Sequence, residues 1–276
     1  MKELVRKTIR FIAYMIGFGI LLYPAISDFV NQKNSTVAIN NYDEVIQGIT
    51  EEEEQSMLAE ANAYNASLAG NMELSDPFQN QMLDETYQSI LNLDGNGMMA
   101  YLEIPKLKVH MPVYHGVSEA VLQVGAGHVQ NTSFPIGGES THAVLSGHRG
   151  LPSAKLFTEL DKLNEGDIFY IRVLRQTLAY QVDQILTVKP SDTKALKIVE
   201  GEDYVTLVTC TPYAVNTHRL LVRGTRIPYD EAMKVQEQAG TEIVLSTYTK
   251  ALIVGFIVLA IIWIGKKIVE RRRRHG

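Results

Sequence analysis

The run Tyr204-Val205-Thr206-Leu207-Val208-Thr209-Cys210 is rich in β-branched and aliphatic residues and ends at the only cysteine of the 276-residue chain. This composition predicts a buried β-strand with the cysteine at its end. A hydrophobic segment near each end of the chain indicates that this strand lies outside a cell membrane, where a single cysteine cannot form an internal disulfide. The Cys210 thiol is therefore an inert buried group, an intermolecular bridge or a reactive nucleophile.

Short segments of the same kind flank this run and are separated by Gly, Pro and Asp residues. They are Met98–Ile104, Val109–Tyr114, Thr141–Ser146, Asp167–Val173, Leu178–Val188 and Arg219–Ile227. Between them we expect one short helix, Ala154–Leu163. Seven or eight short strands in about 130 residues predict a mainly β fold over residues 98–230, either a barrel or a sandwich.

A helix is expected from Thr50 to Ala69, ahead of the strands. Thr50 and Glu53 have the spacing of a capping box, the glutamates that follow Thr50 suit the positive end of the helix dipole, and Gly70 is a suitable C-cap. Residues 31–49 are polar and mixed, which is typical of a stalk that leads out of a membrane. Residues 31–97 are thus expected to form a stalk, a helix and a further segment before the β domain.

Two apolar segments predict transmembrane helices at residues 11–30 and 247–265, since a membrane-spanning helix needs about 20 mainly apolar residues. The first has a cleaved signal peptide as its alternative, because a basic region precedes it. Basic residues flank both segments on the outer sides, at residues 1–10 and 266–276, so both termini are expected in the cytoplasm. Residues 231–246 would link the β domain to the second helix.

Charge is distributed as this topology requires. Residues 31–246 contain 15 Lys and Arg against 28 Asp and Glu, a net charge of −13, whereas the two short terminal segments are strongly basic. An acidic extracellular part argues against a nucleic-acid partner. The expected location is the plasma membrane, with the β domain outside.

Two residues near Cys210 have the chemistry that a cysteine nucleophile needs. His148 follows a predicted strand within Leu145-Ser146-Gly147-His148-Arg149-Gly150, and Arg219 begins the next strand after Cys210. An imidazole can exchange a proton with the thiol, and a guanidinium can stabilise an oxyanion. A zinc site built from His142, His148, His218 and Cys210 is the competing interpretation, although no close ligand pair supports it.

Several of these residues together resemble the motifs of a known family. Thr206-Leu207-Val208-Thr209-Cys210 is similar to the TLxTC motif of sortases, the membrane-anchored cysteine transpeptidases of Gram-positive bacteria. The segment around His148 and the position of Arg219 resemble the other two catalytic elements of that family. The resemblance covers residues 70–230 and implies a closed β-barrel of seven to eight strands with short helices, an N-terminal helical and lid extension, and two flanking transmembrane helices.

The resemblance extends to class C sortases, which polymerise pilins. These enzymes typically carry a C-terminal membrane helix and an N-terminal lid with an Asp-Pro-aromatic motif, and Asp76-Pro77-Phe78 stands at the corresponding place in this sequence. By resemblance, Asp76 reaches towards Arg219 and Phe78 covers Cys210 and His148. A carboxylate would neutralise the guanidinium, and the aromatic ring would exclude water and substrate.

The mechanism implied by this resemblance is a transpeptidation without metal or cofactor. Cys210 attacks the Thr–Gly bond of an LPxTG-like sorting signal on a pilin precursor, His148 acts as general acid, and Arg219 positions the substrate and stabilises the oxyanion. A lysine amine of the next pilin then accepts the acyl group. The alternatives are a membrane-anchored cysteine protease, a housekeeping sortase that attaches proteins to the cell wall, and a non-enzymatic β-barrel adaptor.

Overall fold

The computed structural model describes residues 2–68, 74–79, 82–239, 254–255 and 257, and the chain divides into one unit at residues 1–240 and a second at 241–276. Of the second unit, Val254, Gly255 and Ile257 are helical. The predicted second membrane helix lies otherwise outside the described residues, as does the basic tail at 266–276. The first unit contains all of the predicted strands.

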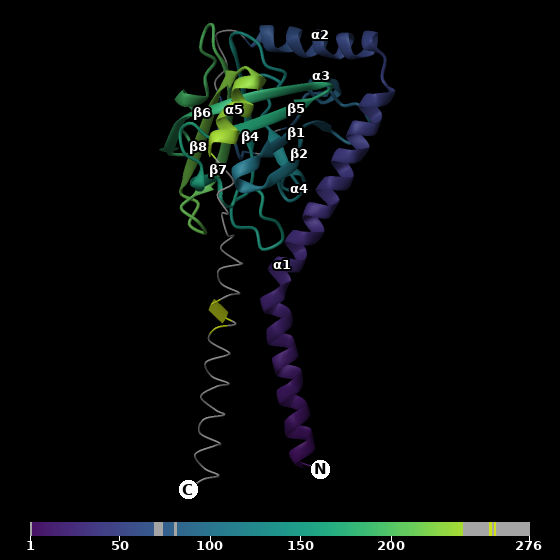
Figure 1. Cartoon of the computed structure of the whole chain (residues 1–276), viewed down its shortest axis with the longest axis vertical. Helices are drawn as coiled ribbons and strands as arrows, with labels where there is room; N and C mark the ends of the chain where they lie inside the picture. Colours follow the sequence, from purple (N-terminus) through teal and green to yellow (C-terminus); the bar gives the residue numbers. More distant parts are fainter. Residues whose placement is uncertain (1, 69–73, 80–81, 240–253, 256, 258–276) are drawn as a thin grey trace. The chain divides into compact units, whose positions relative to one another are not determined.

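Eight strands in this unit close into a barrel with the order β1-β2-β3-β4-β7-β8-β6-β5 (Figure 1). The closed barrel confirms the mainly β prediction and excludes the sandwich. The strands are β1 (Met98–Ile104), β2 (Val109–His115), β3 (Ala126–His128), β4 (Thr141–Ser146), β5 (Ile168–Val173), β6 (Gln176–Val188), β7 (Asp203–Thr211) and β8 (His218–Ile227).

Seven of these strands match the predicted segments to within two residues at either end, and β3 is the one that sequence reasoning missed. Its sequence, Ala126-Gly127-His128, contains no β-branched residue and is too short for an alternating pattern. It is extended because it pairs with β2 on one side and β4 on the other. Tertiary pairing, not local propensity, makes this strand.

The helix expected at Ala154–Leu163 is wrong. This stretch consists of turns and ends in a 3-10 helix, η2 (Leu160–Lys162). The backbone N–H of Lys155 is bonded to the Asp28 carboxylate at 2.7 Å instead of to its own turn, and Leu156 has a positive φ of 37°. Buried apolar residues at helical spacing give residues 154–163 the sequence pattern of a helix. Core packing and the contact with the N-terminal part of the chain hold these residues in turns instead.

Five further short elements surround the barrel. They are the helices α3 (Glu85–Ser89), α4 (Glu119–Leu122) and α5 (Tyr229–Ala239) and the 3-10 helices η1 (Pro105–Leu107) and η3 (Lys194–Leu196). Most of α5 falls in the segment expected to be a linker. Ala232 and Val235 pack it against Ile168 and Tyr170 of β5, so this part of the segment belongs to the folded unit.

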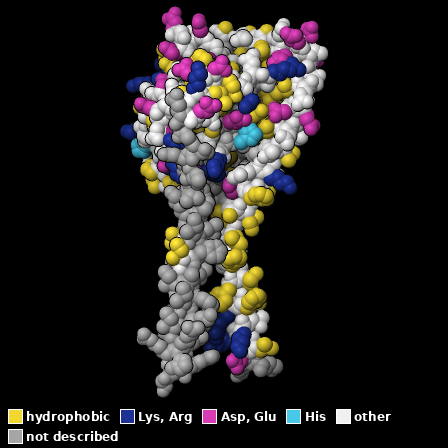
Figure 2. Space-filling view, viewed as in Figure 1, with side chains coloured by type: hydrophobic (Ala, Val, Ile, Leu, Met, Phe, Trp, Pro, Cys, Tyr) yellow, Lys and Arg dark blue, Asp and Glu magenta, His cyan; other side chains and the backbone are white. Residues whose placement is uncertain are grey.

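A single helix, α1 (Lys2–Gly48), contains both the predicted first membrane segment and the predicted stalk. Its N-terminal part has exposed apolar side chains (Figure 2), and among the described residues it is the one helix long and apolar enough to cross a membrane. The stalk is ordered because Ile39, Tyr42 and Ile46 are buried against β1, where Met98 and Tyr101 are among their neighbours.

The predicted capping box starts α2 (Glu51–Ser67). The backbone N–H of Glu53 donates to the Thr50 hydroxyl at 3.2 Å, and the backbone N–H of Thr50 donates to the Glu53 carboxylate at 2.8 Å. Near the end of α2, the buried Asn65 amide bonds both the N–H of Phe134, at 2.7 Å, and its carbonyl, at 3.3 Å. The predicted C-cap Gly70 lies outside the described residues. These contacts hold α2 on the barrel just ahead of residues 74–79.

Candidate active site

The order of β4, β7 and β8 brings the three predicted catalytic residues to one edge of the barrel. Cys210 near the end of β7 lies opposite Arg219 near the start of β8. On the other side of β7, the parallel strand β4 pairs with it up to Ser146 opposite Val208. His148 follows the last paired residue of β4 by two positions, as Cys210 follows Val208 in β7. Two strands and the segment after β4 thus contribute the thiol, the guanidinium and the imidazole.

Residues of the Thr-Leu-Val-Thr lead-in hold this edge together. The Thr209 hydroxyl donates to the carbonyl of Gly147 at 2.7 Å, and the backbone N–H of Gly147 donates to the carbonyl of Val208 at 3.0 Å. Leu207 is fully buried in the main core. Thr206 is bonded through its hydroxyl to His142 Nε2 at 2.7 Å. These motif residues are therefore structural, and they fix where β7 and the His148 segment end.

Asp76 binds Arg219 with both carboxylate oxygens. Arg219 Nε donates to Oδ1 at 2.9 Å and NH2 donates to Oδ2 at 2.6 Å. The guanidinium is mostly buried, so this bidentate pair neutralises a charge that little water can screen. The segment expected to form a lid thus contacts one of the three predicted catalytic residues directly.

Phe78 lies across the same edge. Its ring centroid is 6.1 Å from that of His148 with an interplanar angle of 30°, and the Arg219 guanidinium carbon is 5.0 Å from its centroid. Pro77 contributes its backbone, because its carbonyl accepts a hydrogen bond from the buried Ser146 hydroxyl at 2.9 Å. Sequence reasoning did not find Ser146, since an ordinary strand serine carries no signal of this contact.

Leu74 and Phe78 also cover an apolar patch on the outside of the barrel. Leu74 is held at its carbonyl by the Thr193 hydroxyl at 3.1 Å. Both side chains pack against a second hydrophobic cluster, separate from the main core. Its buried members are Val117, Leu122, Val129, Val144, Leu196, Val208 and Leu221. The segment at residues 74–78 therefore lies on an apolar surface that extends from the three predicted catalytic residues.

The surroundings of Cys210 favour the neutral thiol. Burial raises the pKa of the Cys210 thiol; the nearby Arg219 guanidinium lowers it, and the Asp76 carboxylate raises it again. Asp76 thus has two effects, because it occupies the guanidinium and also disfavours a thiolate. The thiol is partly exposed and forms no disulfide. These surroundings favour the protonated, less reactive form of the predicted nucleophile.

His148 has a partner that the sequence did not indicate. Its Nε2 lies 3.1 Å from a carboxylate oxygen of Glu119, which belongs to α4, the short helix that follows β2. The Gln123 amide and then His148 lower the pKa of the Glu119 carboxyl. The Glu119 side chain is 66% exposed, so this contact is accessible to solvent and weak. Only the folded chain brings it to His148.

The histidines proposed as zinc ligands have other surroundings. His142 donates from Nδ1 to the Lys197 carbonyl at 2.9 Å and accepts from Thr206, so both of its ring nitrogens are bonded. His218 has the Thr217 hydroxyl 3.0 Å from its Nδ1. Within the part of the chain that the structure describes, no group of three or more His, Cys, Asp or Glu residues is placed to hold a metal ion.

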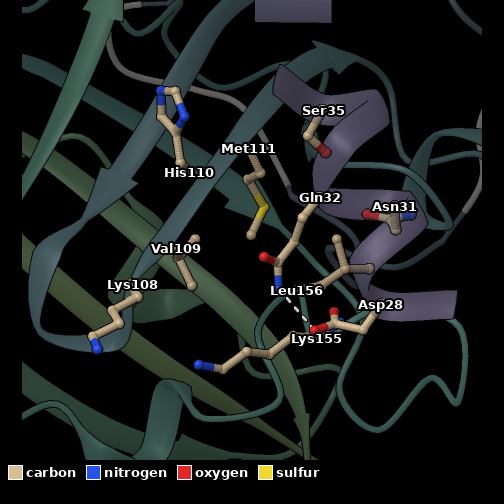
Figure 3. Close-up of a pocket in the computed structure, with 10 residues that line it drawn as sticks. All are labelled: Asp28, Asn31, Gln32, Ser35, Lys108, Val109, His110, Met111, Lys155 and Leu156. Carbon is tan, nitrogen blue, oxygen red and sulfur yellow. Dashed lines mark hydrogen bonds between the residues drawn. The ribbon is translucent and has the colours of Figure 1, made fainter. Parts of the chain in front are cut away.

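A pocket lies elsewhere, between α1 and β2 (Figure 3). Asp28 and Gln32 of α1 face Val109 and Met111 of β2, and Gln32 Nε2 donates to Asp28 at 2.8 Å. The pocket contains none of the predicted catalytic or lid residues. It therefore belongs to the docking of α1 on the barrel and not to the candidate active site.

Comparison with known proteins gives one consistent result. Residues 102–227 match the sortase domain. Among curated proteins, sortase A of Streptococcus agalactiae serotype III is 30% identical over 127 residues, which are 45% of this chain and 50% of that protein. Sortase D of Bacillus subtilis is 26% identical over 129 residues, or 46% of this chain and 62% of that protein. The chain thus spans less than two thirds of either relative.

Solved structures match over more of the chain. Streptococcus pneumoniae sortase C, whose structure is described in terms of catalysis and pilin substrate specificity, is 48% identical, with a TM-score of 0.64. The match covers 70% of this chain and 97% of that one. Sortase C-1 of Actinomyces oris is 44% identical, with a TM-score of 0.61, over 64% of this chain and 99% of that one.

Proposed function

This chain belongs to the sortase family, and from that premise we propose that it is a class C cysteine transpeptidase that polymerises pilins. The observation that carries the proposal is the meeting of Cys210, His148 and Arg219 at one barrel edge beneath Asp76 and Phe78. A thiol, an imidazole and a guanidinium at one edge supply the nucleophile, the general acid and base, and the oxyanion stabiliser that acyl transfer requires.

The proposed reaction has two acyl-transfer steps. Cys210 loses its proton to His148, and its sulfur attacks the threonine carbonyl of an LPxTG-like sorting signal. Arg219 stabilises the oxyanion, and His148 returns the proton to the leaving glycine amine as the Thr–Gly bond breaks. The resulting thioester is attacked by a lysine amine of the next pilin, which forms an isopeptide bond and releases the thiol. No atom changes its oxidation state in either step, so these residues need no redox cofactor.

Residues 74–78 must move before this reaction starts. Asp76 occupies the guanidinium that would hold the oxyanion, and Phe78 lies over the imidazole. Leu74 and Phe78 also occupy the apolar patch along which an extended sorting peptide would bind. We therefore infer that this segment is a lid and that the described conformation is the closed, inactive one.

The first test uses the full chain in detergent with a sorting-signal peptide. We expect a thioester adduct of the peptide's N-terminal part on Cys210 by mass spectrometry, and we expect none with Cys210→Ala. Addition of a pilin domain with its acceptor lysine should then give an amide-linked product. A free peptide carboxylate as the sole product would instead identify a cysteine protease, and transfer only to a cell-wall peptide amine would identify a housekeeping sortase.

A test in cells separates the enzyme from a binding protein. With Cys210→Ala in place of the wild-type chain, we expect pilin monomers to remain unpolymerised, because no thioester can form. Unchanged covalent polymer in this variant would eliminate the transpeptidase proposal and favour the non-enzymatic adaptor, which needs no thiol.

The lid is tested by the rate at which a thiol reagent modifies Cys210. Phe78→Ala should increase this rate several-fold, because the ring no longer covers the site. Tyr229→Ala is the matched control, since Tyr229 is a 43% exposed aromatic residue on α5 and contacts Tyr170 instead of the site. Equal rates in Phe78→Ala and the parent would show that residues 74–78 do not restrict access to Cys210.

The proposed location is the plasma membrane of a Gram-positive bacterium, with two transmembrane helices and the barrel outside. The exposed apolar side chains of the N-terminal part of α1 and the basic residues at both chain ends support it. Protease treatment of intact protoplasts should digest the barrel and leave epitope tags at both termini protected. Digestion of either tag would overturn the proposed topology.

A further inference from the structure

A second connection joins the His148 and Cys210 segments, one residue beyond each of them. Arg149 directly follows His148, and Thr211 directly follows Cys210. Arg149 NH1 donates to the Thr211 hydroxyl at 3.0 Å. A single side-chain hydrogen bond thus spans from the segment of the predicted general acid to the strand of the predicted nucleophile.

The Arg149 guanidinium is anchored at its other end. Its NH2 donates to Asp161 Oδ2 at 2.5 Å. Asp161 belongs to η2, which is fixed to the core by the fully buried Leu160. The planar guanidinium therefore bridges two fixed partners, which the flexible ammonium of a lysine cannot do with the same geometry.

Burial of the Arg149 guanidinium has a desolvation cost that its hydrogen bonds must offset. Its side chain is only 9% exposed, and Nε is buried without a hydrogen-bond partner among the described residues. A buried guanidinium with an unsatisfied N–H group has a desolvation penalty that one ion pair does not fully offset. A role in stability alone is therefore a poor explanation of this residue.

His148 lies between this connection and the one made by Gly147. On the N-terminal side of His148, Gly147 is bonded to Val208 and Thr209 of β7. On its C-terminal side, Arg149 is bonded to Thr211 of the same strand. The two links lie before and after His148 in the chain, so the backbone around His148 is tied on both sides to the strand that carries Cys210.

We propose that Arg149 is a positioning residue that sets the spacing of His148 and Cys210 through its bond to Thr211. The proposal rests on the proposed function, in which a proton passes between the two side chains. Proton transfer requires the two groups within hydrogen-bond reach, and a displacement of about 1 Å can lower a rate by roughly a hundredfold. Arg149 touches neither substrate nor thiol in this role.

Thr211→Val is the most informative variant, because it removes the acceptor hydroxyl and leaves Arg149 and Asp161 paired. Thr211→Ser restores the hydroxyl. The matched control is Thr177→Val, which deletes a bond of the same kind in another part of the barrel, where Arg172 NH1 donates to the Thr177 hydroxyl at 3.0 Å. All variants are made in the full chain in detergent and compared for thermal unfolding.

With saturating sorting peptide, Thr211→Val should form the thioester roughly ten- to a hundredfold more slowly, whereas the KM for the peptide changes little. Thr211→Ser should recover most of the rate, and Thr177→Val should match the parent. This split between rate and KM, with rescue by serine, is not expected of a residue that only stabilises the fold. Parent-like thioester formation by Thr211→Val would overturn the proposal.

A second readout needs no peptide. In the parent, His148→Ala should change the pH dependence of Cys210 alkylation by iodoacetamide, because the proposed function has the two groups exchange a proton. When Thr211→Val is also present, His148→Ala should alter the pH dependence of Cys210 alkylation clearly less. An equal effect in both backgrounds would contradict the positioning role, even if the parent formed no thioester. Failure of the parent to form a thioester would contradict only the proposed function.

Discussion

At the scale of single residues, the site depends on which carboxylate pairs with which guanidinium. Two arginines of β8 form the same bidentate pair, Arg219 with Asp76 and Arg223 with Asp183. Asp183 comes from the neighbouring strand β6 and stays with its partner. Asp76 comes from a segment 143 residues earlier in the chain and lies next to the only thiol. Movement of residues 74–78 alone can therefore separate the Asp76 pair, whereas Asp183 belongs to a strand of the barrel itself.

The first prediction concerns the pKa of Cys210. Asp76→Asn removes a negative charge that raises this pKa, so the pKa should fall and the thiolate should form at a lower pH. The midpoint of the alkylation rate against pH should therefore move to lower pH. Asp183→Asn is the matched control and should leave the midpoint unchanged. If both variants behave like the parent, Asp76 has no electrostatic effect on the thiol.

At the level of elements, α1 extends the predicted membrane segment into the folded unit as one helix. Asp28 is bonded to the backbone of Lys155, and Asn31 Nδ2 donates to the carbonyl of Gln123 at 3.3 Å, so contact with the barrel begins where the apolar segment ends. Tyr42 continues this contact. Its hydroxyl donates to the Met99 carbonyl at 2.9 Å and accepts from the Leu174 N–H at 3.0 Å.

The second prediction is that Tyr42→Phe destabilises the folded unit by ~1–3 kcal/mol, because the variant leaves the buried N–H of Leu174 without this partner. Urea unfolding of the full chain in detergent measures the change. Tyr14→Phe is the matched control in the same helix and should have no effect, since Tyr14 is 74% exposed. An unchanged midpoint for Tyr42→Phe would mean that α1 is not coupled to barrel stability.

At the scale of the whole molecule, two histidines are buried in neutral form. His128 and His142 are at most 1% exposed. Burial lowers the pKa of His128 from 6.5 to about 3 and that of His142 to about 4. The unfolded chain therefore binds more protons than the folded chain between about pH 4 and pH 6.5, and stability should be lost as the pH falls through this range.

The third prediction is that the folded unit loses stability in acid, and that His128 and His142 each account for a stated part of the loss. At pH 5 each histidine should have lost about 2 kcal/mol of its stabilising contribution relative to neutral pH. His142→Gln, which cannot titrate, should reduce the slope of stability against pH by about 1 kcal/mol per pH unit between pH 6 and pH 5. Identical slopes in the variant and the parent would show that His142 does not remain neutral in the folded state.

Local sequence patterns are sufficient to predict a helix or strand wherever that element is determined by its own residues. The capping box at Thr50 and Glu53 involves residues three apart, and seven strands carry enough β-branched and apolar residues to be recognised. The patterns failed where partners are distant. Ala126–His128 is a strand because two neighbours pair with it, and the stretch at 154–163 forms turns because it packs on the core and on α1.

For the candidate site, the residue types that give the chemistry could be read from the chain, because Cys210, His148, Arg219 and Asp76 stand in short stretches that resemble family motifs. The partners of these residues depend on the fold: Glu119 lies beside His148, Ser146 lies beneath Pro77, and Arg149 is bonded to Thr211. The physical reason is that residue types are fixed along the chain, whereas hydrogen bonds and charge pairs depend on distances between segments. Those distances are set by the register of β4, β7 and β8 when the barrel closes.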